Sequence, residues 1–291
     1  MSTTNIPSKP AMAPVSKLNT DAWSADNYNA IASFVYSKEF TTPVLSLLNA
    51  QPGECILDLG CGSGELTLEL AKIVGESGVV LGIDSSANMI EKARKHGVTA
   101  CIVGDAQALE LPPPSNIREE ISRALPASFD YKFDAIFTNA ALHWCKRSPG
   151  GVAEGAARAL RKGGPLRRRN GRIYQLRLRM AIHTVMRGWG YDPVQLDPWY
   201  FPSIEDYTQV LENAGFRVSH IALVPRLTPL KTDIVDWQRT FCRNTFFSVL
   251  SDSDAEDVMR EVQELCTVDC KDASGRWALM YTRLRFVAVL E

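Results

Sequence analysis

Short apolar runs alternate with amphipathic segments through the first half of the chain. Runs typical of buried strands cover 55–59, 79–83, 98–103 and 133–138. Segments with helical spacing of apolar residues follow three of them, ending near Val74, His96 and Leu160. Because this order joins parallel strands through crossover helices, it predicts an α/β fold with a doubly wound, Rossmann-like sheet.

The flanking regions have weaker patterns. Residues 1–20 are rich in Ser, Thr, Pro and Lys and predict a flexible tail, whereas 21–50 have the spacing of amphipathic helices. Further helical segments are expected near 180–189, 203–214, 232–248 and 253–266. Two late strands, at about 216–224 and 277–290, are expected to pair antiparallel at one edge, so the sheet is mostly parallel with an antiparallel edge strand.

Composition narrows the class of protein. The 291 residues are 45% hydrophobic and 22% charged with a net charge of −1, which is typical of a folded globular chain without the positive field of a nucleic-acid binder. Seven cysteines without a CxxC pair predict free thiols and no metal site. No signal peptide and no apolar run of about 18 residues are visible, so we expect no membrane association and a cytoplasmic location.

A glycine-rich turn follows the first predicted strand. Gly60, Gly62 and Gly64 stand in the sequence ILDLGCGSGEL. Glycines there let the backbone approach a ligand closely, and the following helix presents free amide groups. The turn therefore predicts a nucleotide-like ligand; the alternative is an ordinary turn between a strand and a helix.

Acidic residues end three of the predicted strands. Asp58, Asp84 and Asp105 are expected at the same carboxyl edge of the sheet, where Asp84 can accept hydrogen bonds from a ribose. Glu65 replaces the third glycine of a dinucleotide fingerprint, and several carboxylates disfavour a pyrophosphate. A ligand with ribose, adenine and a cationic tail fits this edge, and S-adenosyl-L-methionine has these parts. Each Asp alone could instead cap a helix.

At this point the chain resembles the class I S-adenosylmethionine-dependent methyltransferases. The likeness rests on four motifs taken together: ILDLGCGSG, VVLGIDSS, VGDAQAL and FDAIFTNAALHW. More narrowly, WSADNYNAIASFV and DPWYFPSIEDY resemble the trans-aconitate methyltransferase-like group of fungal type. The resemblance implies a methyltransferase domain over 51–291, with substrate-side elements at about 180–270.

The resemblance also implies roles for individual residues. The methionine part of the cofactor would lie over the glycine turn, near Gly60, Cys61, Gly62, Gly64 and, around its amino group, Asp58. The nucleoside would be held by Asp84, with Ser85 beside it, and by Asp105 and Ala106 at the adenine. Asn139 would lie beside the methyl donor, and Trp23 and Tyr28 would belong to a lid formed by helices of 21–50.

Methyl transfer from a sulfonium needs alignment of donor and acceptor more than catalytic side chains. If the acceptor is a hydroxyl or an amine, His143 is the best candidate base, whereas a carboxylate acceptor needs none. Trp144 is a candidate wall of the substrate pocket, and Trp189, Trp199, Tyr200 and Phe201 are weaker ones. The alternative for His143 and Trp144 is plain packing.

A basic run does not fit this family pattern. Between Arg158 and Arg179, nine of 22 residues are basic and none is acidic, where the resembling proteins have an apolar fifth strand. We hypothesise that roughly 165–178 is a misread frame or splice artefact. We expect a small-molecule methyltransferase, which could belong to specialised metabolism. Two alternatives stay open: an RNA methyltransferase, and a catalytically degenerate protein that binds the cofactor.

Overall fold

The computed structural model describes residues 38–111, 125, 129–162, 165–169 and 176–291. They group into two compact units. One consists of Leu176–Pro198 and Pro229–Ala278, and the other of the described part of Thr20–Gln175 with Trp199–Thr228 and Leu279–Glu291. Because the chain passes between the units several times, neither is one continuous stretch of sequence. Trp23, Tyr28 and the predicted tail lie outside the described residues.

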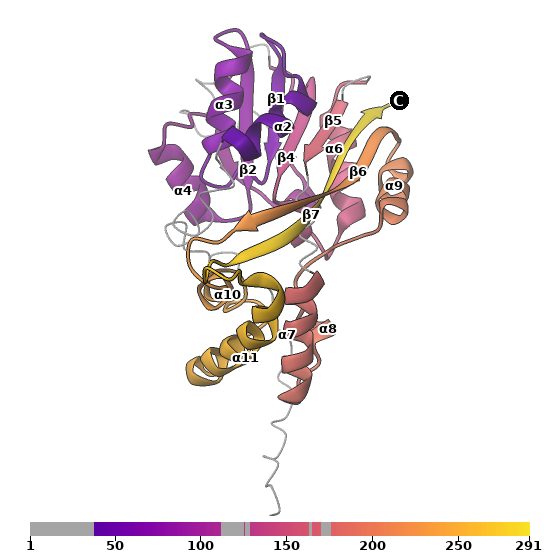
Figure 1. The fold of residues 1–291 in the computed structure, drawn as a ribbon. Coiled ribbons are helices and arrows are strands. Elements are labelled where there is room, and N and C mark those ends of the chain that lie inside the picture. The colour runs from indigo at the N-terminus through magenta and orange to yellow at the C-terminus, as the bar shows by residue number, and fades with distance from the viewer. Residues whose placement is uncertain (1–37, 112–124, 126–128, 163–164, 170–175) are drawn as a thin grey trace, which may run out of the picture. The chain divides into compact units, whose positions relative to one another are not determined.

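The larger unit is built on a seven-stranded sheet with the order β3-β2-β1-β4-β5-β7-β6 (Figure 1). Its parallel strands are β1 (Cys55–Leu59), β2 (Val79–Asp84), β3 (Cys101–Val103), β4 (Ala135–Asn139) and β5 (Pro165–Arg169). β7 (Ala278–Leu290) pairs antiparallel with β5, and β6 (Phe216–Pro229) forms the edge. The predicted α/β class with a doubly wound, mostly parallel sheet is confirmed.

Two strand predictions were wrong in their bounds. β3 begins at Cys101 and not at Val98, because Val98 packs under the C-terminal end of a helix and its amide binds the Ala93 carbonyl. β4 begins at Ala135 because Phe133 forms only an isolated bridge with Leu160. Both differences lie at strand ends, which local apolar pattern defines poorly.

The basic run forms a strand despite its charges. β5 pairs in parallel with β4, in the register Asn139 to Arg169, and antiparallel with β7, in the register Arg169 to Arg285. The fifth strand is therefore present and carries charges where the resembling proteins have apolar residues, because the backbone can pair on both sides whatever its side chains are. The frame hypothesis for 165–178 stays a prediction.

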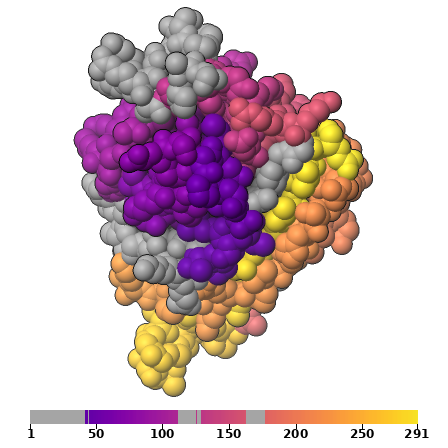
Figure 2. Space-filling model, turned by 90° about the horizontal axis from the view of Figure 1, so that it is seen from above, coloured from indigo at the N-terminus to yellow at the C-terminus, as the bar shows by residue number. Residues whose placement is uncertain are grey.

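The late strands run further than the sequence suggested. The amide of Glu291 binds the carbonyl of Gly215, and the amide of Leu230 binds that of Trp277. Since the start of one strand meets the end of the other at both places, β6 and β7 are antiparallel, as predicted. Figure 2 shows them side by side in orange and yellow.

Helices cover both faces of the sheet. On one face, α2 (Lys38–Leu48) and α3 (Glu65–Val74) pack against Ile56 and Phe137. On the other, α6 (Pro149–Ala159) and α9 (Ile204–Asn213) pack against a core that includes Leu57, Ile136 and Phe286. α4 (Ala87–Lys95) follows β2, and its side-chain cap is Ser86, whose hydroxyl accepts from the Met89 amide at 3.3 Å. All seven cysteines are free thiols, as predicted.

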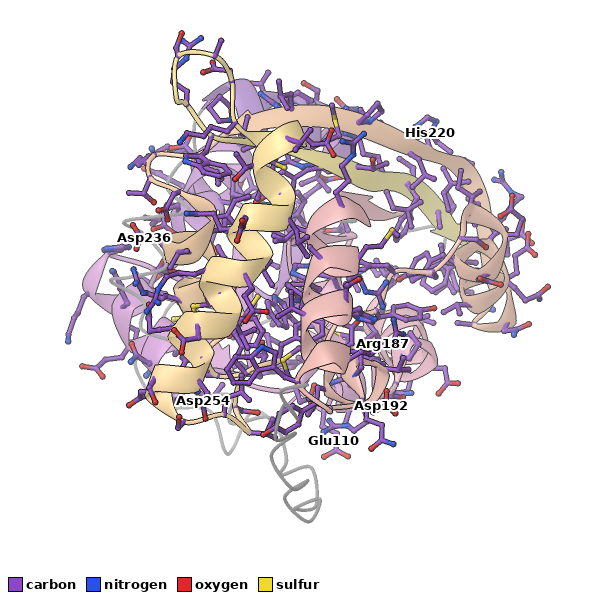
Figure 3. All side chains as sticks on the ribbon, turned by 60° about the horizontal axis from the view of Figure 1, so that its bottom comes forward. Glu110, Arg187, Asp192, His220, Asp236 and Asp254 are labelled. Atoms are coloured by element: carbon purple, nitrogen blue, oxygen red, sulfur yellow. The ribbon has the colours of Figure 1, made fainter. Side chains whose placement is uncertain are left out.

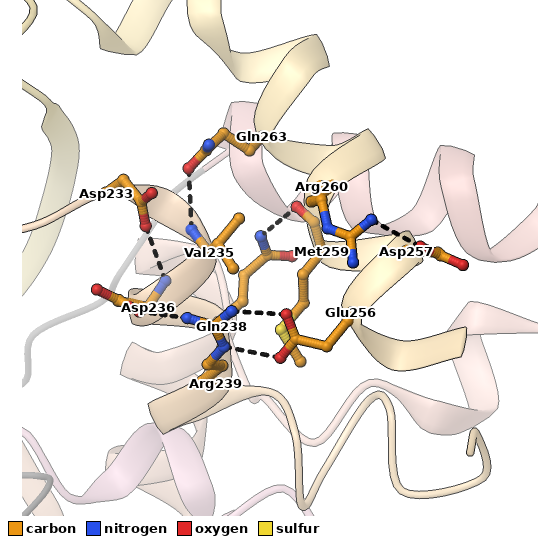
Figure 4. A network of polar contacts seen from close by, with 10 residues as sticks. All are labelled: Asp233, Val235, Asp236, Gln238, Arg239, Glu256, Asp257, Met259, Arg260 and Gln263. Atoms are coloured by element: carbon orange, nitrogen blue, oxygen red, sulfur yellow. Dashed lines mark hydrogen bonds and ion pairs between the residues drawn. The ribbon is translucent and has the colours of Figure 1, made fainter. Parts of the chain in front are cut away.

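The smaller unit is helical. It contains α7 (Leu176–Gly188), α8 (Pro193–Leu196), α10 (Ile234–Phe241) and α11 (Asp252–Cys270). Polar contacts join α10 to α11: Arg239 binds both carboxylate oxygens of Glu256 at 2.7 and 2.6 Å, and Gln238 donates to the Met259 carbonyl at 3.0 Å (Figure 4). Inside the unit, the buried Asp197 binds Arg179 and His183. No helix among the described residues is long and apolar enough to span a bilayer.

Candidate active site

The glycine turn lies between β1 and α3 and is tied to β2. The amides of Gly60 and Cys61 both bind the carbonyl of Ile83, at 2.7 and 3.0 Å. Gly60, Gly62 and Gly64 have φ values of 75°, 55° and 88°, which side chains disfavour. A Cβ at Gly60 would overlap Ala141, and one at Gly64 would overlap Val98. Glycine is therefore favoured in this turn because of the positive φ values and, at Gly60 and Gly64, because a Cβ would have no room.

Cys61 takes part in this turn through its amide and through its thiol, which donates to the Gly62 carbonyl at 3.7 Å. Its side chain is 7% exposed and packs in a small apolar cluster with Ile90, Val98 and Cys101. Burial raises the pKa of its thiol well above the ordinary range. The thiol is therefore neutral and inert, and any role of Cys61 in cofactor binding belongs to its peptide group.

Asp84 holds the turn from the end of β2. One of its oxygens accepts from the Gly62 amide at 3.0 Å, and the other accepts from the Ser86 amide at 2.9 Å. Burial raises the pKa of Asp84, while these two hydrogen bonds lower it. Each carboxylate oxygen can accept a second hydrogen bond, so the group can still bind the hydroxyls of a ribose. Ser85 follows Asp84 and is exposed at the same place.

Asp58 is the most deeply buried of the three acids, at 2% exposure. It accepts a hydrogen bond of 2.7 Å from the Thr67 hydroxyl on α3. Burial, helped by the nearby charge of Asp84, raises its pKa to about 7 although the Thr67 hydrogen bond opposes this. Asp58 can therefore gain or lose a proton near neutral pH, and a cation bound beside it would favour the charged form.

Asp105 lies after β3 and caps the short 3₁₀ helix η3 (Ala106–Ala108), accepting from the Gln107 amide at 2.9 Å. Its second oxygen forms an ion pair with Arg147. This partner was not predicted, because the two residues lie far apart in the chain and no motif surrounds Arg147. Ala106, half-buried, is the first residue of η3.

Asn139 is the last residue of β4, and a short loop leads from it to the 3₁₀ helix η5 (Leu142–Trp144). Ala140 in this loop has a φ of 55°, a conformation that costs a non-glycine residue about 1–2 kcal/mol. Ala141 then lies against Gly60. The loop therefore brings the end of β4 next to the glycine turn.

His143 and Trp144 belong to an aromatic group beyond β4. His143 is 4% exposed, its ring lies 4.9 Å from that of Trp144 and 6.2 Å from that of Phe201, and its carbonyl accepts from the Tyr200 amide at 2.8 Å. Trp199 lies 6.1 Å from Trp144. These contacts favour packing for His143, while the half-buried Trp144 keeps an open side.

Trp189, the remaining aromatic candidate, and His220 lie on other elements. Trp189 is in the helical unit, where its indole donates to Glu261 at 3.2 Å. His220 lies exposed on β6 (Figure 3).

Comparison with known proteins agrees with this geometry. Residues 56–164 match the family model described as "Methyltransferase domain". An uncharacterised methyltransferase of Schizosaccharomyces pombe is 35% identical over 277 residues, which cover 92% of this chain and 98% of that protein.

Solved structures show the same fold. The methyltransferase bound to the Trm112 activator in Haloferax volcanii is 19% identical, with 94% and 98% of the two chains covered and a TM-score of 0.54. A putative methyltransferase of Bacillus halodurans is 14% identical, with 86% and 98% covered and a TM-score of 0.55. From the whole-length relative, the family match and the fold, we conclude that this chain belongs to the class I S-adenosylmethionine-dependent methyltransferases.

Proposed function

We propose that the chain transfers the methyl group of S-adenosyl-L-methionine to a small-molecule acceptor. The observation that carries the proposal is the position of three acids, Asp58, Asp84 and Asp105, at the ends of neighbouring strands around a turn that only glycines can form. This edge suits a ligand that carries positive charge together with ribose and adenine.

The residues fit the cofactor as follows. Asp84 binds the ribose hydroxyls, with Ser85 beside it, while Asp105 and Ala106 receive the adenine. Gly60, Gly62 and Gly64 leave room for the methionine part, and Asp58 compensates its ammonium group through the intervening backbone or water. Asn139 borders the position of the methyl group. Arg147 must share or release Asp105 when adenine binds, because it occupies one oxygen of that carboxylate.

When bound, the cofactor supplies an electrophilic methyl group on a sulfonium. Held by Asp58, Asp84 and Asp105, the cofactor would give this methyl group to a lone pair of the acceptor and would leave as the thioether S-adenosylhomocysteine. The protein aligns the two reactants and excludes water. Trp144, with Trp199 and Phe201 behind it, provides an apolar wall for the acceptor.

Incubation with methyl-labelled S-adenosylmethionine tests the proposal. The protein is given either a small-molecule extract or total RNA, with Asp84→Asn as the inactive control. We expect label in the small-molecule fraction alone. Label in RNA would show that the acceptor is RNA and not a small molecule. Binding of the cofactor without label in either fraction would support a catalytically degenerate protein.

A further inference from the structure

A histidine outside the strand ends binds the glycine turn. His96 is the C-cap residue of α4, and its Nδ1 atom lies 2.9 Å from the carbonyl oxygen of Ser63. Ser63 stands between Gly62 and Gly64 in the turn. Because a carbonyl oxygen only accepts hydrogen bonds, Nδ1 of His96 must carry the proton and donate it. The imidazole therefore joins the end of α4 to the middle of the turn.

This hydrogen bond holds one peptide group of the turn together with a second one on its other side. The peptide between Ser63 and Gly64 is planar, so its C=O and N–H groups point in opposite directions. The C=O accepts from His96, and the N–H donates to the Cys61 carbonyl at 3.1 Å. If this peptide turned over, the Ser63 carbonyl would face the Cys61 carbonyl and His96 would lose its acceptor. The two hydrogen bonds therefore select one orientation of the peptide.

The glycines on either side make such a restraint necessary. Gly62 and Gly64 have φ values of 55° and 88°, and glycine adopts positive and negative φ about equally readily. The peptide between Cys61 and Gly62 is restrained in another way, because its N–H donates to Asp84 at 3.0 Å. The turn is thus held by Asp84 at one peptide and by His96 at the next but one.

Glu65 holds the side chain of the same serine. Ser63 is fully buried, and its hydroxyl oxygen lies 2.8 and 2.7 Å from the two carboxylate oxygens of Glu65, the first residue of α3. One of these oxygens lies 3.8 Å from Nδ1 of His96. A carboxylate at this distance favours a proton on that nitrogen. The surroundings of Ser63 are therefore those that suit His96 as a donor.

We propose that His96 is a positioning residue for cofactor binding: by donating to the Ser63 carbonyl, it keeps the glycine turn in the orientation that receives the methionine part of S-adenosylmethionine. It acts through the peptide group and not by touching the cofactor. The position requires an N–H donor, and not a charge or an aromatic ring. The inference rests on the proposed function, because it concerns the same cofactor site.

The test compares three variants of the full chain with the parent. His96→Leu removes the donor, whereas His96→Asn keeps an N–H group on a side chain that branches at the same carbon as leucine. The His96 side chain is 37% exposed, so both replacements are expected to fold. His220→Leu is the matched control, because His220 is exposed on β6.

Affinity for S-adenosylhomocysteine is measured by calorimetry, and thermal melts without ligand check that each variant is folded. We expect the dissociation constant to rise about fivefold or more in His96→Leu and to stay within about twofold of the parent in the other two variants. Hydrogen exchange of the Gly64 amide should speed up in His96→Leu and not in His96→Asn. A general loss of stability would not confine the faster exchange to the turn.

Equal affinity of the parent and His96→Leu would overturn the proposal. A loss in His96→Asn as large as that in His96→Leu would overturn it as well, because the donor would then not be the cause. A parent that does not bind S-adenosylhomocysteine would contradict the proposed function itself. The failure of the positioning role and the failure of the proposed function are therefore distinguishable in one experiment.

Discussion

The two halves of the sheet carry opposite charges. Asp58 and Asp84 lie at the carboxyl ends of β1 and β2, and Asp105 follows β3, whereas β6 and β7 carry Arg226, Arg283 and Arg285. In the acidic half, backbone amides and a hydroxyl already occupy some carboxylate oxygens. In the basic half, Arg285 has an unused donor. The difference is between carboxylates whose oxygens are partly occupied by donors of the glycine turn and a guanidinium nitrogen that has no acceptor among the described residues.

The largest effect is expected in the acidic half, at the glycine turn. Gly60→Ala combines a disfavoured φ of 75° with overlap against Ala141. It should lower the free energy of unfolding by about 2–5 kcal/mol and abolish cofactor binding. Gly97→Ala is the control, because its φ is also positive but nothing lies within 4 Å of the new Cβ. Urea unfolding that gives equal losses for both would remove the packing argument.

Asp84→Asn comes next. The amide would set its NH₂ group against the amide of Gly62 or Ser86, and the negative charge that favours the ligand would be gone. We expect the affinity for S-adenosylmethionine to fall by about 1.5–3 kcal/mol, the value of charge-assisted hydrogen bonds. Glu91→Gln, an exposed partner of Lys95 on α4, should leave it unchanged. Equal affinity of both variants would take Asp84 out of the site.

The pH dependence of binding tests Asp58. Its pKa of about 7 means that the free protein keeps a proton there below neutrality. A cationic ligand favours the ionised carboxylate, so binding releases the proton, and affinity should rise with pH up to about 7 and then level off. Between pH 6 and 8 the change should be about tenfold. Calorimetry in buffers of different ionisation enthalpy measures the proton release, and Asp58→Asn should abolish it.

The smallest effect is expected at His143, in the aromatic group between the halves. Its buried ring packs on Trp144 and Phe201, so His143→Gln should change turnover by no more than about twofold on an acid whose carboxylate receives the methyl group. A loss of at least about tenfold, with parent turnover rising through pH 6–7, would make His143 a base for a hydroxyl or amine acceptor.

The site residues of the acidic half could be predicted from the sequence because each lies next to the strand that positions it. Gly60, Gly62 and Gly64 are contiguous with the strand that they follow, and Asp84 and Asp105 each end an apolar run. The ion pair of Asp105 with Arg147 was missed, because only the tertiary fold brings these residues together.

The basic half was not predicted for a similar reason. Arg285 is one arginine in an alternating strand until the pairing with β5 places it in register with the end of β4. The charges of β5 depart from the apolar pattern of a central strand, yet the backbone forms one. The pairing of a strand depends on partner strands that lie far away in the sequence. The pattern of apolar and polar residues within one strand does not identify these partners.

Calorimetric titration with S-adenosylmethionine tests the central claim most directly, namely that the acidic half binds this cofactor. The account predicts saturable binding at one site per chain, weakened at least tenfold by Asp84→Asn and unaffected by Glu91→Gln. Absence of binding to the parent at millimolar cofactor, or binding that Asp84→Asn leaves intact, would contradict it.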